Sequence, residues 1–268
     1  MSYNSATMLF ETKKKRRERL KKTPFPSDQL AIVERNVPYY RFLPPADQEE
    51  LRGLVQIFLA EKKFEGCDGL LITDEIRLTI AAQACMLLLH RKTDIYPLLQ
   101  SVLVYPRAFV APLKERGPGG VVIEDFEERD GESWDIGALI LSWDDVLESV
   151  ADVHDGYNVV FHEFAHQLDD ESGIADGAPP LPEQSMYADW SRVLGAEYDA
   201  LVEAVERHRP TLLDEYGAES PAEFFAVATE AFFELPHDLK AAHPELYEQL
   251  SRYYRQDPAS YTPAAPRR

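Results

Sequence analysis

Cysteine is scarce in this sequence, since Cys67 and Cys85 are the only two among 268 residues and each lies in or beside an apolar segment. Two cysteines cannot build a disulfide framework or a zinc site made of several thiolates, so we expect two reduced thiols in the core. Long apolar runs are also missing, because no stretch approaches the roughly 18 apolar residues of a membrane span. The segment Met1 to Phe10 lacks the basic start and apolar centre of a secretory signal. The sequence therefore predicts a soluble, cytoplasmic protein that makes no contact with membranes.

Positive charge is in short supply outside the first 24 residues. The chain has a formal net charge of −19, yet residues 1–24 carry eight basic side chains and two acidic ones. An acidic surface repels phosphate groups, so we expect no nucleic-acid partner for the folded domain. Blocks of like charge are usually solvated, which predicts a basic disordered tail at residues 1–24. A single domain is then expected at 25–258, followed by a flexible, Pro- and Ala-rich C-terminal tail at 259–268.

The apolar pattern predicts an α+β fold that is mostly helical. Apolar residues recur at helical spacing in seven segments: 46–62, 74–90, 144–150, 157–168, 188–209, 221–233 and 244–254. Short apolar or β-branched runs between Pro and Gly predict a small sheet, with strands at Val102–Tyr105, Val121–Ile123 and Ala138–Leu141.

The most informative segment is the apolar stretch Val159–Leu168, which contains His162, Glu163 and His166. Residues four apart lie on one face of a helix, so the two imidazoles converge and supply half of a tetrahedral zinc site. Glu163 follows the first histidine, and from there its carboxylate reaches a water beside the metal rather than the metal itself. The alternative is a pair of solvated histidines on a half-exposed helix. The apolar surroundings favour the metal site, because a buried and unpaired cluster of this kind is costly.

A catalytic zinc site needs a third protein ligand. Glu223 is the leading candidate, because it lies in the first turn of the helix that Pro221 begins. Glu230 is seven residues further on the same face, and Asp169 is three residues past His166, so both remain rivals. An acid that does not bind the metal could instead orient a histidine ligand from behind. We expect one Zn²⁺ per chain.

Two segments, His162–Asp169 and Ser220–Val227, resemble the Mlc titration factor A family of bacterial zinc peptidases. The resemblance covers about Phe25 to Pro258. The same core is similar to the catalytic domain of anthrax lethal factor, which has a tyrosine seven residues before its ligand glutamate, and Tyr216 stands in that place here. By this resemblance Glu223 is the third ligand, and Tyr216 is a donor that stabilises the transition state.

The resemblance also implies a gluzincin-like fold, in which a small mixed sheet lies beside the active-site helix. Its edge strand receives an extended substrate, and residues 138–141 are the natural candidate for that edge. Many gluzincins carry an acid four residues after the third ligand, where this chain has Val227. The role of orienting a histidine is thus left to Glu230 or Asp169.

Together these features predict a zinc-dependent metallopeptidase in which Glu163 passes a proton from water to the leaving amine of a peptide or protein substrate. The resemblance adds an aminopeptidase-like action. The alternative is a regulatory protein that sequesters a transcriptional repressor of the Mlc type, as the family name implies. A structural zinc site with four protein ligands is a third possibility. The intact Glu163 favours an enzyme, because sequestration requires no base.

Overall fold

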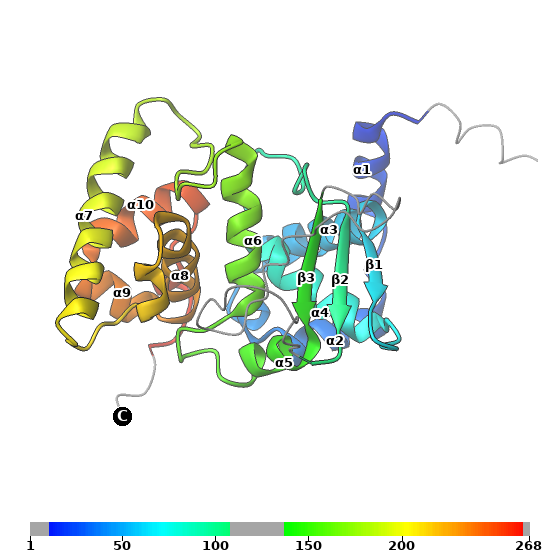
Figure 1. The fold of residues 1–268 in the computed structure, drawn as a ribbon. Coiled ribbons are helices and arrows are strands. Elements are labelled where there is room, and N and C mark those ends of the chain that lie inside the picture. The colour runs from blue at the N-terminus through cyan, green and yellow to red at the C-terminus, as the bar shows by residue number, and fades with distance from the viewer. Residues whose placement is uncertain (1–10, 108–136, 265–268) are drawn as a thin grey trace, which may run out of the picture.

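Helices make up most of the part of the chain that the computed structural model describes, residues 11–107 and 137–264 (Figure 1). The α-helices are α1 (Lys13–Lys22), α2 (Ser27–Asn36), α3 (Pro45–Glu61), α4 (Asp74–Met86), α5 (Trp143–Ala151), α6 (Val159–Asp169), α7 (Met186–Glu206), α8 (Pro221–Glu234), α9 (Pro236–Ala242) and α10 (Pro244–Tyr254). The strands are β1 (Lys63–Gly66), β2 (Ser101–Tyr105) and β3 (Ala138–Ser142). Short 3₁₀ helices are η2 (Pro38–Arg41), η3 (Asp170–Ser172), η4 (Glu215–Ala218) and η5 (Pro258–Ser260). The predicted α+β fold, mostly helical with a small sheet, is confirmed.

Helix α6 runs through the middle of the molecule, with the sheet and α2–α5 on one side and α7–α10 on the other (Figure 1). Its apolar side chains, among them Phe161, Phe164 and Leu168, are buried in a core that both sides share. It packs mainly against α8, and also against α4 and β3. A functional group on α6 is therefore held by apolar burial on both sides.

The sheet has the order β1-β2-β3 and is parallel throughout the described strands. The expectation of a mixed sheet is wrong for these strands. Helix α4 lies between β1 and β2 in the chain. It carries the chain back to the end of the sheet where β1 began, so that β2 can run parallel to β1. Strand β1 was not predicted, because it has four residues and its side chains are largely exposed. The strand predicted at Val121–Ile123 lies outside the described residues.

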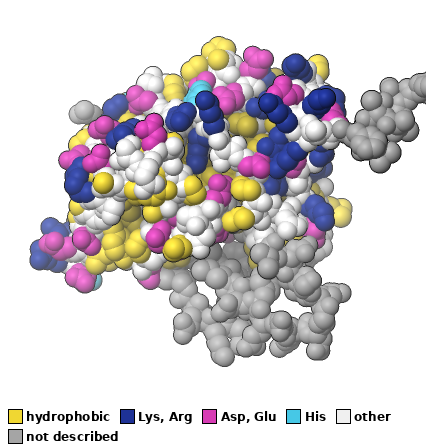
Figure 2. Space-filling model, turned by 90° about the horizontal axis from the view of Figure 1, so that it is seen from above, with side chains coloured by type: hydrophobic (Ala, Val, Ile, Leu, Met, Phe, Trp, Pro, Cys, Tyr) yellow, Lys and Arg dark blue, Asp and Glu magenta, His cyan; other side chains and the backbone are white. Residues whose placement is uncertain are grey.

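The basic N-terminal block is a helix rather than a disordered tail over Lys13–Lys22. Arg17 binds both carboxylate oxygens of Glu61, at 2.7 and 2.5 Å, and also pairs with Asp94, to which Lys13 adds a 2.8 Å ion pair. These acids come from the end of α3 and from the loop after α4, so they neutralise part of the basic block. Figure 2, in which the molecule is seen from above, shows Lys and Arg side chains gathered in the region where α1 lies.

The C-terminal segment is also ordered further than predicted. Residues 258–260 form η5, and the half-buried Tyr261 packs against the core. The Tyr261 hydroxyl donates to Gln256 Oε1 at 3.2 Å, and the Thr262 carbonyl lies 2.9 Å from His237 Nε2. The expected flexible tail at 259–268 is therefore wrong for residues 259–262, while 265–268 lie outside the described residues.

Neither cysteine forms a disulfide, and burial raises the pKa of the Cys85 thiol. Within residues 11–107 and 137–264, no helix combines the length and the apolar character needed to cross a membrane.

Replacing Arg17 with Met should lower the free energy of unfolding at pH 7 by about 1–2 kcal/mol, because a mostly buried, bidentate ion pair is lost. The hydrogen bond from Arg17 lowers the pKa of Glu61 below its ordinary value of 4.5. This contribution is therefore complete above pH 4.5 and disappears as the pH falls through the folded-state pKa. Urea unfolding of both proteins at pH 7, 5 and 3 measures it.

Arg207→Met is the matched control, since Arg207 pairs with Glu203 in an exposed i,i+4 arrangement. It should change the stability by about 0.5 kcal/mol or less. Equal effects of the two substitutions, or an Arg17 effect that persists at pH 3, would show that this ion pair does not hold α1 in place.

Candidate metal centre

Helix α6 places the two histidine side chains on one face. Its first turn is capped by Asn158, whose Oδ1 accepts a hydrogen bond from Phe161 N at 2.9 Å. The rings of His162 and His166 then lie with their centroids 4.9 Å apart, and their Nε2 atoms are separated by 3.2 Å. Both Nε2 atoms thus point to one place beside the helix, as the spacing predicted.

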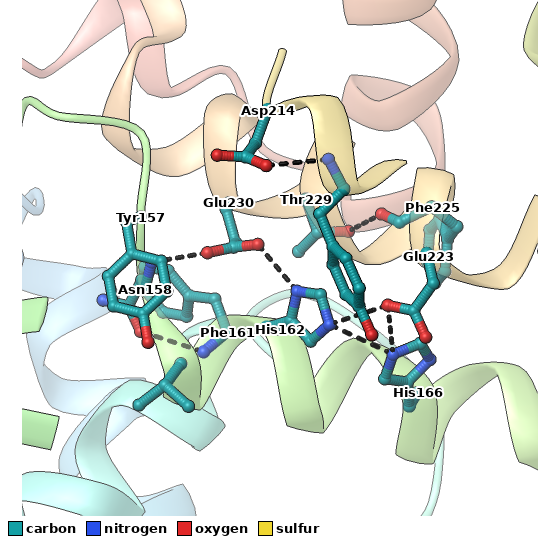
Figure 3. Close-up of polar contacts among 12 residues, drawn as sticks. Tyr157, Asn158, Phe161, His162, His166, Asp214, Glu223, Phe225, Thr229 and Glu230 are labelled. Carbon is teal, nitrogen blue, oxygen red and sulfur yellow. Dashed lines mark hydrogen bonds and ion pairs between the residues drawn. The ribbon is translucent and has the colours of Figure 1, made fainter. Parts of the chain in front are cut away.

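Helix α8 brings Glu223 to the same place (Figure 3). Pro221 occupies the first turn, and Ser220 caps the helix by accepting a hydrogen bond from Glu223 N at 3.2 Å. The Oε2 atom of Glu223 lies 3.0 Å from His162 Nε2 and 3.3 Å from His166 Nε2. The three ligand atoms all lie within 4.8 Å of one another, so these residues form a group that could hold a metal ion.

Glu230 lies on the opposite side of the His162 ring (Figure 3). Its Oε1 is 2.7 Å from His162 Nδ1, and its Oε2 accepts a 2.6 Å hydrogen bond from the backbone N–H of Asn158. The Glu230 side chain is almost fully buried. With the Nδ1 proton directed to Glu230, the other ring nitrogen of His162 is turned toward Glu223 and His166.

The electrostatics favour a positive charge at the meeting point of these side chains. Burial lowers the pKa of His162, but hydrogen bonds to Glu223 and Glu230 outweigh it and raise the pKa to about 10. Burial likewise opposes the charged form of Glu223, yet hydrogen bonds to His162 and His166 bring its pKa down to about 2. The carboxylate is therefore ionised at neutral pH. Two imidazoles and one ionised carboxylate are a donor set that suits a divalent transition metal.

Glu163 and Tyr216 flank this group. Glu163 is half-buried on α6; burial raises the pKa of its carboxyl, while the charges of His162 and His166 act in the opposite direction. Tyr216 comes from η4, and its ring centroid is 5.9 Å from that of His162. Burial and then the charge of Glu223 raise the pKa of Tyr216 to about 12, so its hydroxyl remains a donor at neutral pH.

Asp169, predicted as a rival ligand or as support for a histidine, has a different neighbour. Its buried Oδ2 accepts a 2.7 Å hydrogen bond from the backbone N–H of Gly177. Gly177 has φ +77° and lies so close to Pro221 that a Cβ here would be 2.3 Å from the Pro221 oxygen. The structure thus places Asp169 behind the start of α8, whereas Glu223 and Glu230 lie on either side of His162.

The sequence analysis did not single out the buried polar residues around Glu230, namely Tyr39, Gln83, Asn158 and Glu234. Asparagine is among the preferred N-cap residues, and Asn158 precedes the apolar run of α6, so this signal was present. Because the helix was predicted to begin at residue 157, Asn158 was placed inside the helix rather than at its N-cap. Glu234 follows Glu230 by one helical turn, a spacing that places both acids on one face.

The sequence model of the glucose-regulated metallo-peptidase M90 family matches residues 11–255. An uncharacterized protein of Synechocystis sp. is 42% identical over 91% of this chain and 89% of its own length. Mlc titration factor A of Serratia proteamaculans is 32% identical over 81% of this chain and 84% of the relative. Mlc titration factor A of Pectobacterium atrosepticum is 33% identical over 83% of this chain and 84% of the relative.

Glu223→Ala should weaken metal binding by more than about 100-fold, which is the upper range for residues that only support a ligand. Glu230→Ala should weaken it by about 10- to 100-fold, because it removes the partner of His162 Nδ1 and leaves the ligands in place. Asp169→Asn should have little effect on affinity. Titration of the metal-free protein with zinc against a chromophoric chelator measures all three. A larger loss for Glu230→Ala than for Glu223→Ala would assign the third ligand to Glu230.

Proposed function

This chain belongs to the Mlc titration factor A family, the glucose-regulated metallo-peptidases M90, and we propose that it is a zinc-dependent peptidase. The observation that carries the proposal is the convergence of His162, His166 and Glu223, whose ligand atoms lie within 4.8 Å of one another. Three protein ligands are typical of catalytic zinc, which keeps a fourth position for water or substrate. A structural site would instead use four protein ligands.

Zinc held by His162, His166 and Glu223 would polarise the scissile carbonyl and lower the pKa of a water molecule, and the protein's own groups would complete the reaction. Glu163 accepts a proton from the attacking water and delivers it to the leaving amine. Its burial favours this role, because a carboxylate with a raised pKa is a better base near neutral pH. Tyr216 donates a hydrogen bond from its hydroxyl to the oxyanion that develops on the carbonyl. Glu230 holds the His162 ring in place from its Nδ1 side.

The substrate is proposed to bind as an extended peptide along β3, in the gluzincin-like manner that the resemblance to anthrax lethal factor implies. In support, β3 packs against α6, and among the described strands it is the end strand of the sheet and pairs with β2. An added peptide strand gains main-chain hydrogen bonds at such an edge. We also propose aminopeptidase-like cleavage of short peptides. A screen of aminoacyl anilides and a peptide library, run with and without a chelator, tests both the activity and this preference.

A second proposed function is the sequestration of a transcriptional regulator, favoured by the relatives that carry the name Mlc titration factor A. Sequestration needs a binding surface but no base. The two functions are therefore separable by a substitution that removes only the base.

Glu163→Gln should lower kcat by roughly two to four orders of magnitude, since the neutral amide cannot accept the proton. Zinc content should stay the same, because all three ligands are unchanged. Glu215→Gln, which removes an exposed acid in η4, is the control and should hydrolyse peptides like the wild type. Metal analysis and steady-state kinetics give both quantities. Near-normal turnover in Glu163→Gln would rule out Glu163 as the base, whereas lost turnover with retained capture of a regulator would separate the two functions.

Tyr216→Phe removes one hydroxyl and keeps the ring that packs beside His162. It should reduce kcat by about 100- to 1,000-fold, the usual cost of losing one oxyanion donor. KM and zinc affinity should change little, because the hydroxyl acts in the transition state. Wild-type turnover in this variant would reduce Tyr216 to a packing residue.

A further inference from the structure

A buried set of polar side chains lies behind the candidate metal centre, on the side of His162 that faces away from Glu223. Its members are Tyr39, Gln83, Asn158, Glu230 and Glu234. They come from η2, α4, the start of α6 and α8, so the set lies where four segments meet. Polar groups buried in a core are costly unless they are hydrogen-bonded, and this set needs an explanation.

Asn158 is the junction of this set, and Figure 3 shows its contact with Glu230. Its backbone N–H donates to Glu230 at 2.6 Å, and its side-chain oxygen caps α6. Its Nδ2 donates to Gln83 Oε1 at 2.8 Å and to Glu234 Oε1 at 3.3 Å. One fully buried residue therefore binds α8, α4 and the helix that carries both histidines.

Glu234 is the second anchor of Asn158. It lies one turn after Glu230 on α8, and the Tyr39 hydroxyl also donates to its Oε1. Within residues 11–107 and 137–264, the Oε2 atom of Glu234 has no hydrogen-bond partner, and its Oε1 accepts from Asn158 and Tyr39. Burial raises the pKa of Glu234 well above its ordinary value.

We propose that Asn158, anchored by Glu234, is a positioning residue for the metal centre: it fixes Glu230 against His162 Nδ1. The inference rests on the proposed function, because the quantity it controls is the affinity of the histidines for zinc. The Asn158 N–H reaches Glu230 only while the start of α6 stays against α8. The side-chain bonds to Gln83 and Glu234 hold it there. If they are lost, Glu230 loses one of its two donors and the His162 ring loses its fixed orientation.

Asn158→Asp tests this directly. Aspartate keeps an oxygen to cap α6 and keeps the backbone N–H, but it replaces the Nδ2 donor with an acceptor that faces Glu234. Zinc affinity should fall by about 10- to 100-fold. Adding Glu234→Gln supplies an amide NH₂ that can donate to the new carboxylate at position 158, so donor and acceptor have exchanged places. The double variant should therefore recover most of the zinc affinity. Glu234→Gln alone keeps an acceptor oxygen for the Asn158 amide, so it should lose much less zinc affinity than Asn158→Asp does.

Two further variants keep the test decisive. Asn158→Ser retains a capping oxygen and removes the Nδ2 donor without adding an acid, so it should also lose zinc affinity if Asn158→Asp does not fold. The Thr73 hydroxyl caps α4 by accepting a hydrogen bond from Ile76 N. Thr73→Ala removes this cap and should lower the melting temperature of the metal-free protein without changing zinc affinity. Zinc dissociation constants come from chelator competition on the full chain, and melting temperatures from its metal-free form.

The outcomes separate the two proposals. Wild-type zinc affinity in both Asn158 variants, with melting temperatures lowered as in Thr73→Ala, overturns the positioning role and leaves the proposed function intact. A loss in Asn158→Asp that Glu234→Gln does not reverse overturns the anchoring by Glu234. Failure of the wild-type chain to bind zinc overturns both the proposed function and this inference.

Discussion

The 2.7 Å contact between His162 Nδ1 and Glu230 Oε1 joins α6 to α8 where both helices are buried. A carboxyl group buried in such a place is costly unless it is hydrogen-bonded. Glu230 has two, the imidazole of His162 and the backbone of Asn158. The same contact that satisfies Glu230 also turns His162 Nε2 toward Glu223. The orientation of His162 toward Glu223 therefore depends on this hydrogen bond, while α8 itself is held by its buried apolar side chains.

The sequence predicted the part of the site that lies within one helix. The spacing of His162 and His166 fixes their common face, and Glu163 follows from its position between them. Glu223 was named by its place in a helix start, but the choice among Glu223, Glu230 and Asp169 needed the resemblance to a known family. The reason is physical: these acids reach the histidines, or miss them, through the packing of separate elements, and no local periodicity encodes that packing.

The same limit explains the failures in the fold. The block Lys13–Lys22 has the charge pattern of a solvated tail, and it is a helix because it meets Glu61 and Asp94, which lie far along the chain. Strand β1 carries little apolar signal of its own, and it pairs with β2, whose residues 101–104 are buried. In both cases the local sequence pattern does not predict the element, and contacts with residues far along the chain determine it. Asn158 differs, since its local signal as a cap was readable and only its contacts with Gln83 and Glu234 were not.

Asp169 is linked to the start of α8 through Gly177, although it does not contact the candidate ligands. It extends from the end of α6 to Gly177 N, and the Gly177 carbonyl in turn accepts from Trp190 Nε1 of α7 at 3.1 Å. The left-handed backbone at Gly177 lets this turn press against Pro221, at a distance that any side chain would block. Pro221 begins α8, and Glu223 is two residues further along. The helix that carries both histidines thus sets, through Asp169, the point from which the third candidate ligand is presented to them.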